Sequence, residues 1–216
     1  MNGWTLKVWK ENKSILLFLF LMLVFRSACA DWNTVPTGSM KPTIVEGDRI
    51  LVNKLAYDVR LPFTTISLAK LSDPSRGDII VFESKVSGNR LVKRVIGIPG
   101  DMVELRNNRL TINGKALDYE VVASTISTVD KQEDLLGVRH FIRVNKLSSP
   151  LSNFRSIKVP RGQYLALGDN RDNSADSRVI GFVPRNEIIG RSRRVVMSLN
   201  YDNFYIPRKD RFFHTL

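Results

Sequence analysis

The chain has 216 residues, of which 43% are hydrophobic and 25% are charged, and its formal net charge is +12 at pH 7. This length and composition fit a folded protein with one sizeable core and exclude wholesale disorder. The positive charge suits an anionic partner, but no zinc-finger, RNP-type or helix-turn-helix signature accompanies it, so we expect anionic lipid headgroups and no nucleic acid.

The reactive metal-binding residue types are scarce. One cysteine, Cys29, excludes an internal disulfide framework. The two histidines, His140 and His214, stand in unrelated contexts, and we interpret both as surface or packing residues. We therefore expect no metal and no cofactor.

An uncharged apolar run, SILLFLFLMLVF, occupies residues 14–25 between Lys13 and Arg26. One interpretation is a retained transmembrane anchor over residues 14–30, in which Arg26 extends its guanidinium to the interface. The other is the hydrophobic region of a cleaved signal peptide. Twelve residues are short for a span of about 20, and Ala-Cys-Ala at 28–30 is similar to a small-residue cleavage site. We favour the anchor.

The charges that precede the run set the expected topology. Lys7, Lys10 and Lys13 outnumber Glu11, which predicts that residues 1–13 form a cytoplasmic tail. Either interpretation of the apolar run then sends residues 31–216 across the membrane.

Beyond residue 30 the sequence predicts a mostly β protein. Short runs rich in Val, Ile, Leu and Tyr alternate with Gly, Pro, Asn and Asp turn signals. The runs occupy residues 48–57, 77–84, 89–98, 101–114 and 162–169. Asn113-Gly114 predicts a tight hairpin turn. We expect a catalytic β domain over 31–114 and 161–216, with an inserted β subdomain or long loops over 115–160.

The segment TVPTGSMKP, residues 34–42, frames one serine with proline and glycine. It is either only a stiff turn after the apolar run or a turn that holds a reactive Ser39 in a fixed position. A serine nucleophile needs a base, and neither histidine stands in a motif that suggests one. The remaining candidate is a lysine whose pKa is lowered by burial from about 10.4.

Lys93 fits that requirement, because it lies inside the apolar strand-like segment LVKRVIGIPGD at 91–101. Strand alternation places Lys93 and Arg94 on opposite faces, so one of them points toward an apolar face or finds a partner. The alternative is an edge strand that carries both charges into solvent.

The segment GDNRDNSADSR, residues 168–178, is dense in Asp, Asn and Ser. This composition indicates an ordered loop whose side chains bond to its own backbone. A calcium-type loop is the alternative, but the two arginines and the missing final glutamate argue against an EF-hand.

These three motifs and three further segments follow one another along the chain in a characteristic order and spacing. The segments are TGSMKPT at 37–43, GDRILVNK at 47–54, RGDIIVF at 76–82, KRVIGIPGD at 93–101, GDNRDNSADSR at 168–178 and GFVP at 181–184. In this combination the chain resembles the type I signal peptidases of bacteria from Arg26 to about Arg191.

The resemblance implies roles for individual residues. Ser39 matches the nucleophile and Lys93 the general base of a Ser-Lys dyad. Ser174 matches the serine that orients the lysine, and Thr37 takes the place of the hydroxyl that forms the oxyanion hole with the Ser39 N–H.

It also implies a supporting shell. Asp169 with Arg94, and Asp176 with Arg178, match structural ion pairs around the site. The expected apolar walls of pockets that accept Ala-x-Ala are Val35, Pro36, Met40, Ile44, Leu91 and Val92.

The resemblance implies a membrane-anchored serine endopeptidase that removes signal peptides from exported preproteins. It would be a single-pass protein of the bacterial cytoplasmic membrane, with its catalytic domain on the periplasmic side. Its expected partners are exported preproteins and anionic lipids. Two alternatives stay open at this point, a specialised conjugative or pilus-type maturation peptidase and a non-catalytic scaffold at the membrane surface.

Overall fold

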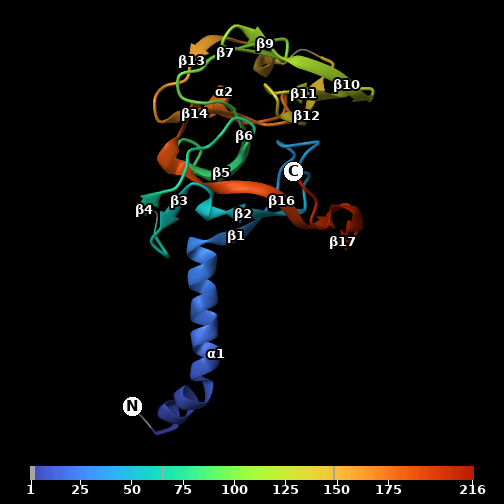
Figure 1. Ribbon diagram of the computed structural model, residues 1–216. Helices are drawn as coiled ribbons and strands as arrows, with labels where there is room; N and C mark the ends of the chain where they lie inside the picture. The colour runs from blue at the N-terminus through green and yellow to red at the C-terminus, as the bar shows by residue number, and fades with distance from the viewer. Residues whose placement is uncertain (1–2, 65, 148) are drawn as a thin grey trace.

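A computed structural model describes residues 3–64, 66–147 and 149–216, and for residues 3–11 it describes the backbone only. One long helix, α1 (Gly3–Ala28), precedes a body built almost entirely of strands. Figure 1 shows α1 projecting away from that body, with the strands gathered at its C-terminal end. The body is mostly β, as the sequence predicts.

A strongly bent sheet of eight strands forms the part of the body next to α1. Its strands are β1 (Ala30–Thr34), β2 (Asp48–Asn53), β5 (Ile79–Ser84), β6 (Asn89–Gly97), β14 (Gln163–Leu167), β15 (Val183–Pro184), β16 (Ile188–Asn200) and β17 (Ile206–Pro207). They lie in the order β1-β2-β16-β5-β6-β14-β15, with β17 paired to β16. The sheet order brings strands from both ends of the chain together, because β16 lies between β2 and β5.

Three smaller sheets surround this one. They contain β3 (Asp58–Arg60) with β4 (Ser67–Lys70); β7 (Met102–Arg106), β8 (Arg109–Ile112), β9 (Lys115–Ala116) and β13 (Phe154–Lys158); and β10 (Asp118–Ser124), β11 (Thr128–Asp134) and β12 (Arg139–Asn145). A second helix in the described residues is the short α2 (Ser177–Ile180). In Figure 1 the β7–β13 strands lie farthest from α1.

The hairpin turn predicted at Asn113-Gly114 is present, whereas the predicted run 48–57 is a strand only to Asn53 and continues as a 3₁₀ helix over Lys54–Ala56. Asn113 and Gly114 both have positive φ, 51° and 80°, and form the two-residue turn between β8 and β9. This is the geometry that favours Asn-Gly in hairpins. The predicted domain border at 114/115 does not coincide with a border between sheets, because β13 from the later segment pairs with β7.

The core lies between these sheets and is apolar. Ile80 and Val81 in β5 and Val95 and Ile96 in β6 are all fully buried. Burial of both faces explains why these strands read as continuous apolar runs. Burying each such side chain contributes about 1.5–3 kcal/mol, so the central strands hold the site residues on a rigid frame.

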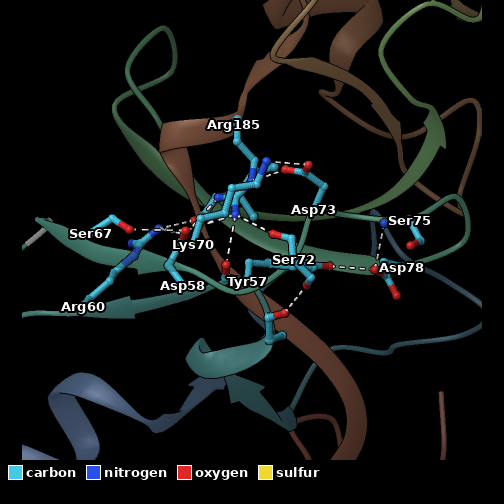
Figure 2. A network of polar contacts seen from close by, with 12 residues as sticks. Tyr57, Asp58, Arg60, Ser67, Lys70, Ser72, Asp73, Ser75, Asp78 and Arg185 are labelled. Carbon is cyan, nitrogen blue, oxygen red and sulfur yellow. Dashed lines mark hydrogen bonds and ion pairs between the residues drawn. The ribbon is translucent and has the colours of Figure 1, made fainter.

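Arg185 ties the β3–β4 hairpin to the sheet. Its guanidinium donates to both carboxylate oxygens of Asp58, at 2.8 and 3.1 Å, and its Nε donates to Asp73 at 3.1 Å. Figure 2 shows Arg185 between these two carboxylates, and Tyr57 connects Arg185 to Asp78, since its carbonyl accepts from Arg185 and its hydroxyl donates to Asp78. The network fixes the segment that leads into β5.

The helix α1 carries apolar side chains that no other part of the described chain covers. Phe18 is 64% exposed and Phe20 is 57% exposed. Within the part of the chain that the structure describes, no helix is both long enough and apolar enough to span a membrane. The predicted anchor therefore stays a prediction, and the side chains of Lys7 and Lys10 lie outside the described residues.

Candidate active site

Ser39 and Lys93 meet at the edge of the bent sheet. Ser39 lies in the turn between β1 and β2, and Lys93 lies in the middle of β6. Lys93 Nζ is 2.8 Å from Ser39 Oγ and also donates to the carbonyl of Val92 at 3.0 Å. Two residues 54 positions apart in sequence thus form one hydrogen-bonded pair.

Burial makes this lysine unusual, since only 3% of Lys93 is exposed. Removal from water lowers its pKa to about 8 from 10.5, against the opposing charges of Asp176 and Asp169. The lowered pKa increases the neutral fraction of the amine near neutral pH, and a neutral amine can accept the proton of a hydroxyl at 2.8 Å.

Arg94 points away from Lys93, as strand alternation predicts. Its Nε and Nη2 donate to the two oxygens of Asp169 at 2.9 and 2.8 Å, and both side chains are at least 96% buried. Thr43 donates to the same carboxylate at 2.6 Å. Burial raises the pKa of Asp169, but Arg94 outweighs that effect and the net pKa falls. The carboxylate is therefore ionised, which keeps the pair intact.

The loop at residues 168–178, here called the Asx loop, is ordered through its own side chains. Asp176 accepts from Arg178 Nε at 2.8 Å and from Arg178 Nη2 at 2.6 Å, and it also accepts from the backbone N–H of Gly168 at 2.9 Å. Arg178 further donates to the carbonyl of Arg171 at 2.6 Å. The loop's two ends are thereby joined.

The Asx loop holds the turn that carries Ser39. The N–H of Asn170 donates to the carbonyl of Ser39 at 3.1 Å, and its side-chain amide donates to the carbonyl of Gly38 at 3.0 Å. A Cβ added at Gly168 would lie 2.4 Å from the Ser39 carbonyl oxygen. Glycine at 168 therefore permits a contact that any side chain would push apart.

Ser174 lies in the same loop, 5% exposed, and its Oγ has no hydrogen-bond partner among the described residues. The hydrogen bond to Lys93 that the resemblance implies is not formed in this structure. A Cβ at Gly168 would lie 2.2 Å from Ser174 Oγ, so the hydroxyl is packed against the loop backbone next to Ser39. Its lysine-orienting role stays a prediction.

A groove of about 530 Å³ opens beside Ser39 and Lys93. This front groove is lined by residues 32–37, 39, 40 and 89–93, which include Val35, Pro36, Thr37, Met40, Leu91 and Val92 from the predicted set. Thr37 is exposed there.

Ile44 differs from the prediction of a pocket wall. It is fully buried and packs in the core with Val35, Met40 and Ile50. The reason is local, because the N–H of Ile44 donates to the carbonyl of Met40 at 2.9 Å and this turn directs the side chain into the core.

Sequence reasoning missed a buried charged cluster that joins the 115–160 segment to the Asx loop. Arg171 donates to both oxygens of Glu133, at 2.9 and 2.6 Å, and both side chains are fully buried. Tyr119 donates to Glu133 at 2.6 Å, and His140 Nε2 lies 3.2 Å from it. Neither Glu133 nor Arg171 stood in an apolar context that would have signalled a buried pair.

The same junction continues through the backbone. The N–H of Arg143 in β12 donates to the carbonyl of Asp169, and the N–H of Arg171 donates to the carbonyl of Arg143, both at 2.8 Å. The segment that the sequence left without a role is therefore the back support of the loop that holds Ser39.

Comparison with known proteins gives a consistent result. The family model described as signal peptidase, peptidase S26, matches residues 8–197. The chain is similar to a signal peptidase I of Pseudomonas fluorescens, 39% identical over 208 residues that cover 87% of this chain and 72% of that protein. Signal peptidase I of Pseudomonas aeruginosa is 38% identical over 203 residues, covering 87% and 72% respectively.

More distant relatives include signal peptidase I of Bacillus amyloliquefaciens, 34% identical over 87% of this chain and 84% of that protein. A crystal structure of a signal peptidase I from Enterococcus faecalis has 32% sequence identity and a TM-score of 0.38, covering 56% of this chain and 97% of that one.

Proposed function

We propose a Ser-Lys mechanism for this chain, which belongs to the signal peptidase family, peptidase S26. The protein is a serine endopeptidase that removes signal peptides from exported preproteins. The observation that carries the mechanism is the 2.8 Å contact between a buried lysine and a half-buried serine that lines the front groove.

In the first step neutral Lys93 Nζ takes the proton of Ser39, and Ser39 Oγ attacks the carbonyl carbon of the scissile bond. The resulting oxyanion accepts hydrogen bonds from the Ser39 N–H and from the Thr37 hydroxyl. Lys93, now an ammonium, gives its proton to the departing amine and leaves an acyl ester on Ser39. A water molecule then attacks the ester carbonyl while Lys93 takes the proton of the water. The acyl–Oγ bond breaks as Lys93 returns that proton to Ser39 Oγ, which releases the signal peptide with a new carboxyl end and restores the free enzyme.

The front groove is suited to an extended peptide. β1 pairs with β2 along one edge, and residues 89–93 of β6 pair with β5 alone among the described strands. Their other edges present backbone N–H and C=O groups that an added strand can bond. The apolar walls Val35, Leu91 and Val92 leave room for small side chains, which favours cleavage after Ala-x-Ala.

We further propose that α1 attaches the enzyme to the bacterial cytoplasmic membrane, with residues 1–13 in the cytoplasm and the β body outside. The support is the bare apolar surface of α1 and its separation from the sheets in Figure 1. Arg26 stacks over Trp32 at 4.7 Å where the helix ends, an arrangement suited to the interface. Resistance to carbonate extraction, with protease access to the β body from outside only, is the expected result. Full release by carbonate would refute the attachment.

Cleavage of a preprotein in detergent, with the cut site mapped by mass spectrometry, tests the mechanism. Ser39→Ala and Lys93→Met are each expected to abolish cleavage without unfolding the protein. The matched controls Ser124→Ala and Lys85→Met, at exposed positions outside the site, should cut at the wild-type rate. Wild-type cleavage by either dyad variant would overturn the assignment, and cleavage of only one specialised client would favour the maturation-peptidase alternative.

A further inference from the structure

A second cavity of about 680 Å³ lies on the side of β6 that faces away from the front groove. Its walls come from the start of β5, from β16 with residues 214–216, and from the β11–β12 hairpin. Arg94 lines this cavity, whereas the preceding residue, Lys93, lines the front groove. We call it the back cavity.

Arginines dominate the charged lining of the back cavity. Its charged side chains are those of Asp78 and the arginines 76, 94, 139, 191 and 193, and Leu216, which carries the carboxylate of the last residue, also lines it. Two of these arginines are committed elsewhere, since Arg76 donates to Asp101 and Arg94 is held by Asp169.

Asp78 neutralises Arg191 and is held within its own wall. Its Oδ2 accepts from the Tyr57 hydroxyl at 2.8 Å and from the Ser75 N–H at 3.0 Å, contacts that Figure 2 shows. Its Oδ1 accepts from Arg191 at 3.2 Å. The carboxylate is thus occupied by the wall that it belongs to.

Two arginines on opposite walls remain available. Arg139 is 73% exposed and reaches Asp134 at only 3.7 Å. Arg193 is exposed, and the ion pairs of the described residues include none that it forms. Between them the cavity has an apolar surface, to which Val138 and the 44% exposed Phe141 contribute.

We propose that the back cavity binds a soluble organic phosphomonoester. Its phosphate lies between Arg139 and Arg193, because guanidinium forks match phosphate oxygens in two-point hydrogen bonds. Its organic part packs against Phe141 and Val138, since the cavity is far larger than a phosphate ion needs. The site lies between the β11–β12 hairpin and the eight-stranded sheet, so a bound ligand contacts both and stabilises their packing.

A lipid headgroup would present a similar phosphate, but the placement favours a soluble source. In Figure 1 the C-terminal end of the chain, which lines the cavity, lies on one side of β16, and α1 leaves β1 on the other. The lining residues at the C-terminal end are therefore separated from the apolar helix by β16.

The test measures binding to the full chain in detergent by calorimetry and by the shift of the unfolding midpoint. The probes are phenyl phosphate, inorganic phosphate and phenol, with chloride at matched ionic strength. We expect phenyl phosphate to bind at least tenfold more tightly than inorganic phosphate and to raise the midpoint, and phenol to do neither.

Arg139→Gln and Arg193→Gln should each weaken phenyl phosphate binding at least tenfold, whereas Arg194→Gln should leave it unchanged. Arg194 is the matched control, an exposed neighbour that does not line the cavity. An equal loss in Arg194→Gln, or an equal shift with chloride, would overturn the site. Binding only to phosphatidylglycerol vesicles, without phenyl phosphate binding, would overturn the soluble ligand.

Discussion

The rate of peptide cleavage should rise with pH along one ionisation, that of Lys93. Only the neutral amine can take the Ser39 proton, and burial places its pKa at about 8 where an exposed lysine titrates at 10.5. At pH 7 roughly 9% of the amine is then neutral, compared with roughly 0.03% for an unshifted lysine. Burial therefore increases the reactive population about 300-fold at this pH.

The assay is kcat/KM for a short fluorogenic Ala-x-Ala peptide between pH 5.5 and 10, because kcat/KM reports ionisations of the free enzyme. We expect a slope of about one log unit per pH unit below pH 7 and a plateau above about pH 9. The variants His140→Gln and His214→Gln separate Lys93 from the two histidines of the chain. A midpoint near 10.5, or a limb that vanishes in either histidine variant, would refute the reasoning.

Three further predictions concern the site and its support. Lys93→Met should raise the free energy of unfolding at pH 7 by up to about 3 kcal/mol in urea titrations. The reason is that below pH 8 the lysine is protonated in both the folded and the unfolded protein, and burying the charged amine costs about 1.4 kcal/mol per unit by which its pKa is lowered. No gain in stability would mean that burial is not what lowers the pKa. Burial raises the pKa of Glu133 but Arg171 and His140 lower it more, so the net pKa falls below 4.5. The stability that Glu133 contributes is therefore present above about pH 4.5 and lost as the pH falls. Glu133→Gln should lower the free energy of unfolding by about 3–5 kcal/mol at pH 7 and by little in acid. An equal loss at neutral and acid pH would contradict this. Thr37→Val should lower kcat about 10²–10³-fold while Thr37→Ser stays near the wild type, and equal kcat for both variants would remove Thr37 from the oxyanion hole.

The stability prediction for Lys93→Met and the predicted pH profile both depend on the free-energy cost of burying a charged amine. A buried amine lowers the stability of the folded enzyme, and the same burial makes the amine a base near neutral pH. A variant that gains stability while losing activity would show that the two effects share one cause.

The positions of β2, β5, β6, β7, β8 and β14 could be predicted from the sequence, because alternation and turn chemistry act locally. The 13-residue strand β16 lay outside the predicted runs. Asn113-Gly114 forms its turn through positive φ values that these residues adopt at little cost. The opposite directions of Lys93 and Arg94 follow from the two-residue repeat of a strand. The motif resemblance added the partners that no local rule supplies.

The placement of Ile44 and the role of residues 115–160 could not be predicted in this way. Ile44 turns into the core through a backbone hydrogen bond to Met40. Glu133 and Arg171 look like surface charges in sequence, and only their mutual contact makes complete burial tolerable.

By itself the sequence determined the central strands β2, β5, β6 and β14, the reactive residue types and the family resemblance. Tertiary structure decided how close Ser39 and Lys93 lie, how deeply the lysine is buried, and which segment supports the loop behind them. The physical reason is that propensity and alternation depend on neighbours along the chain. A pKa, an ion pair and a cavity depend on atoms that only folding brings within a few ångströms.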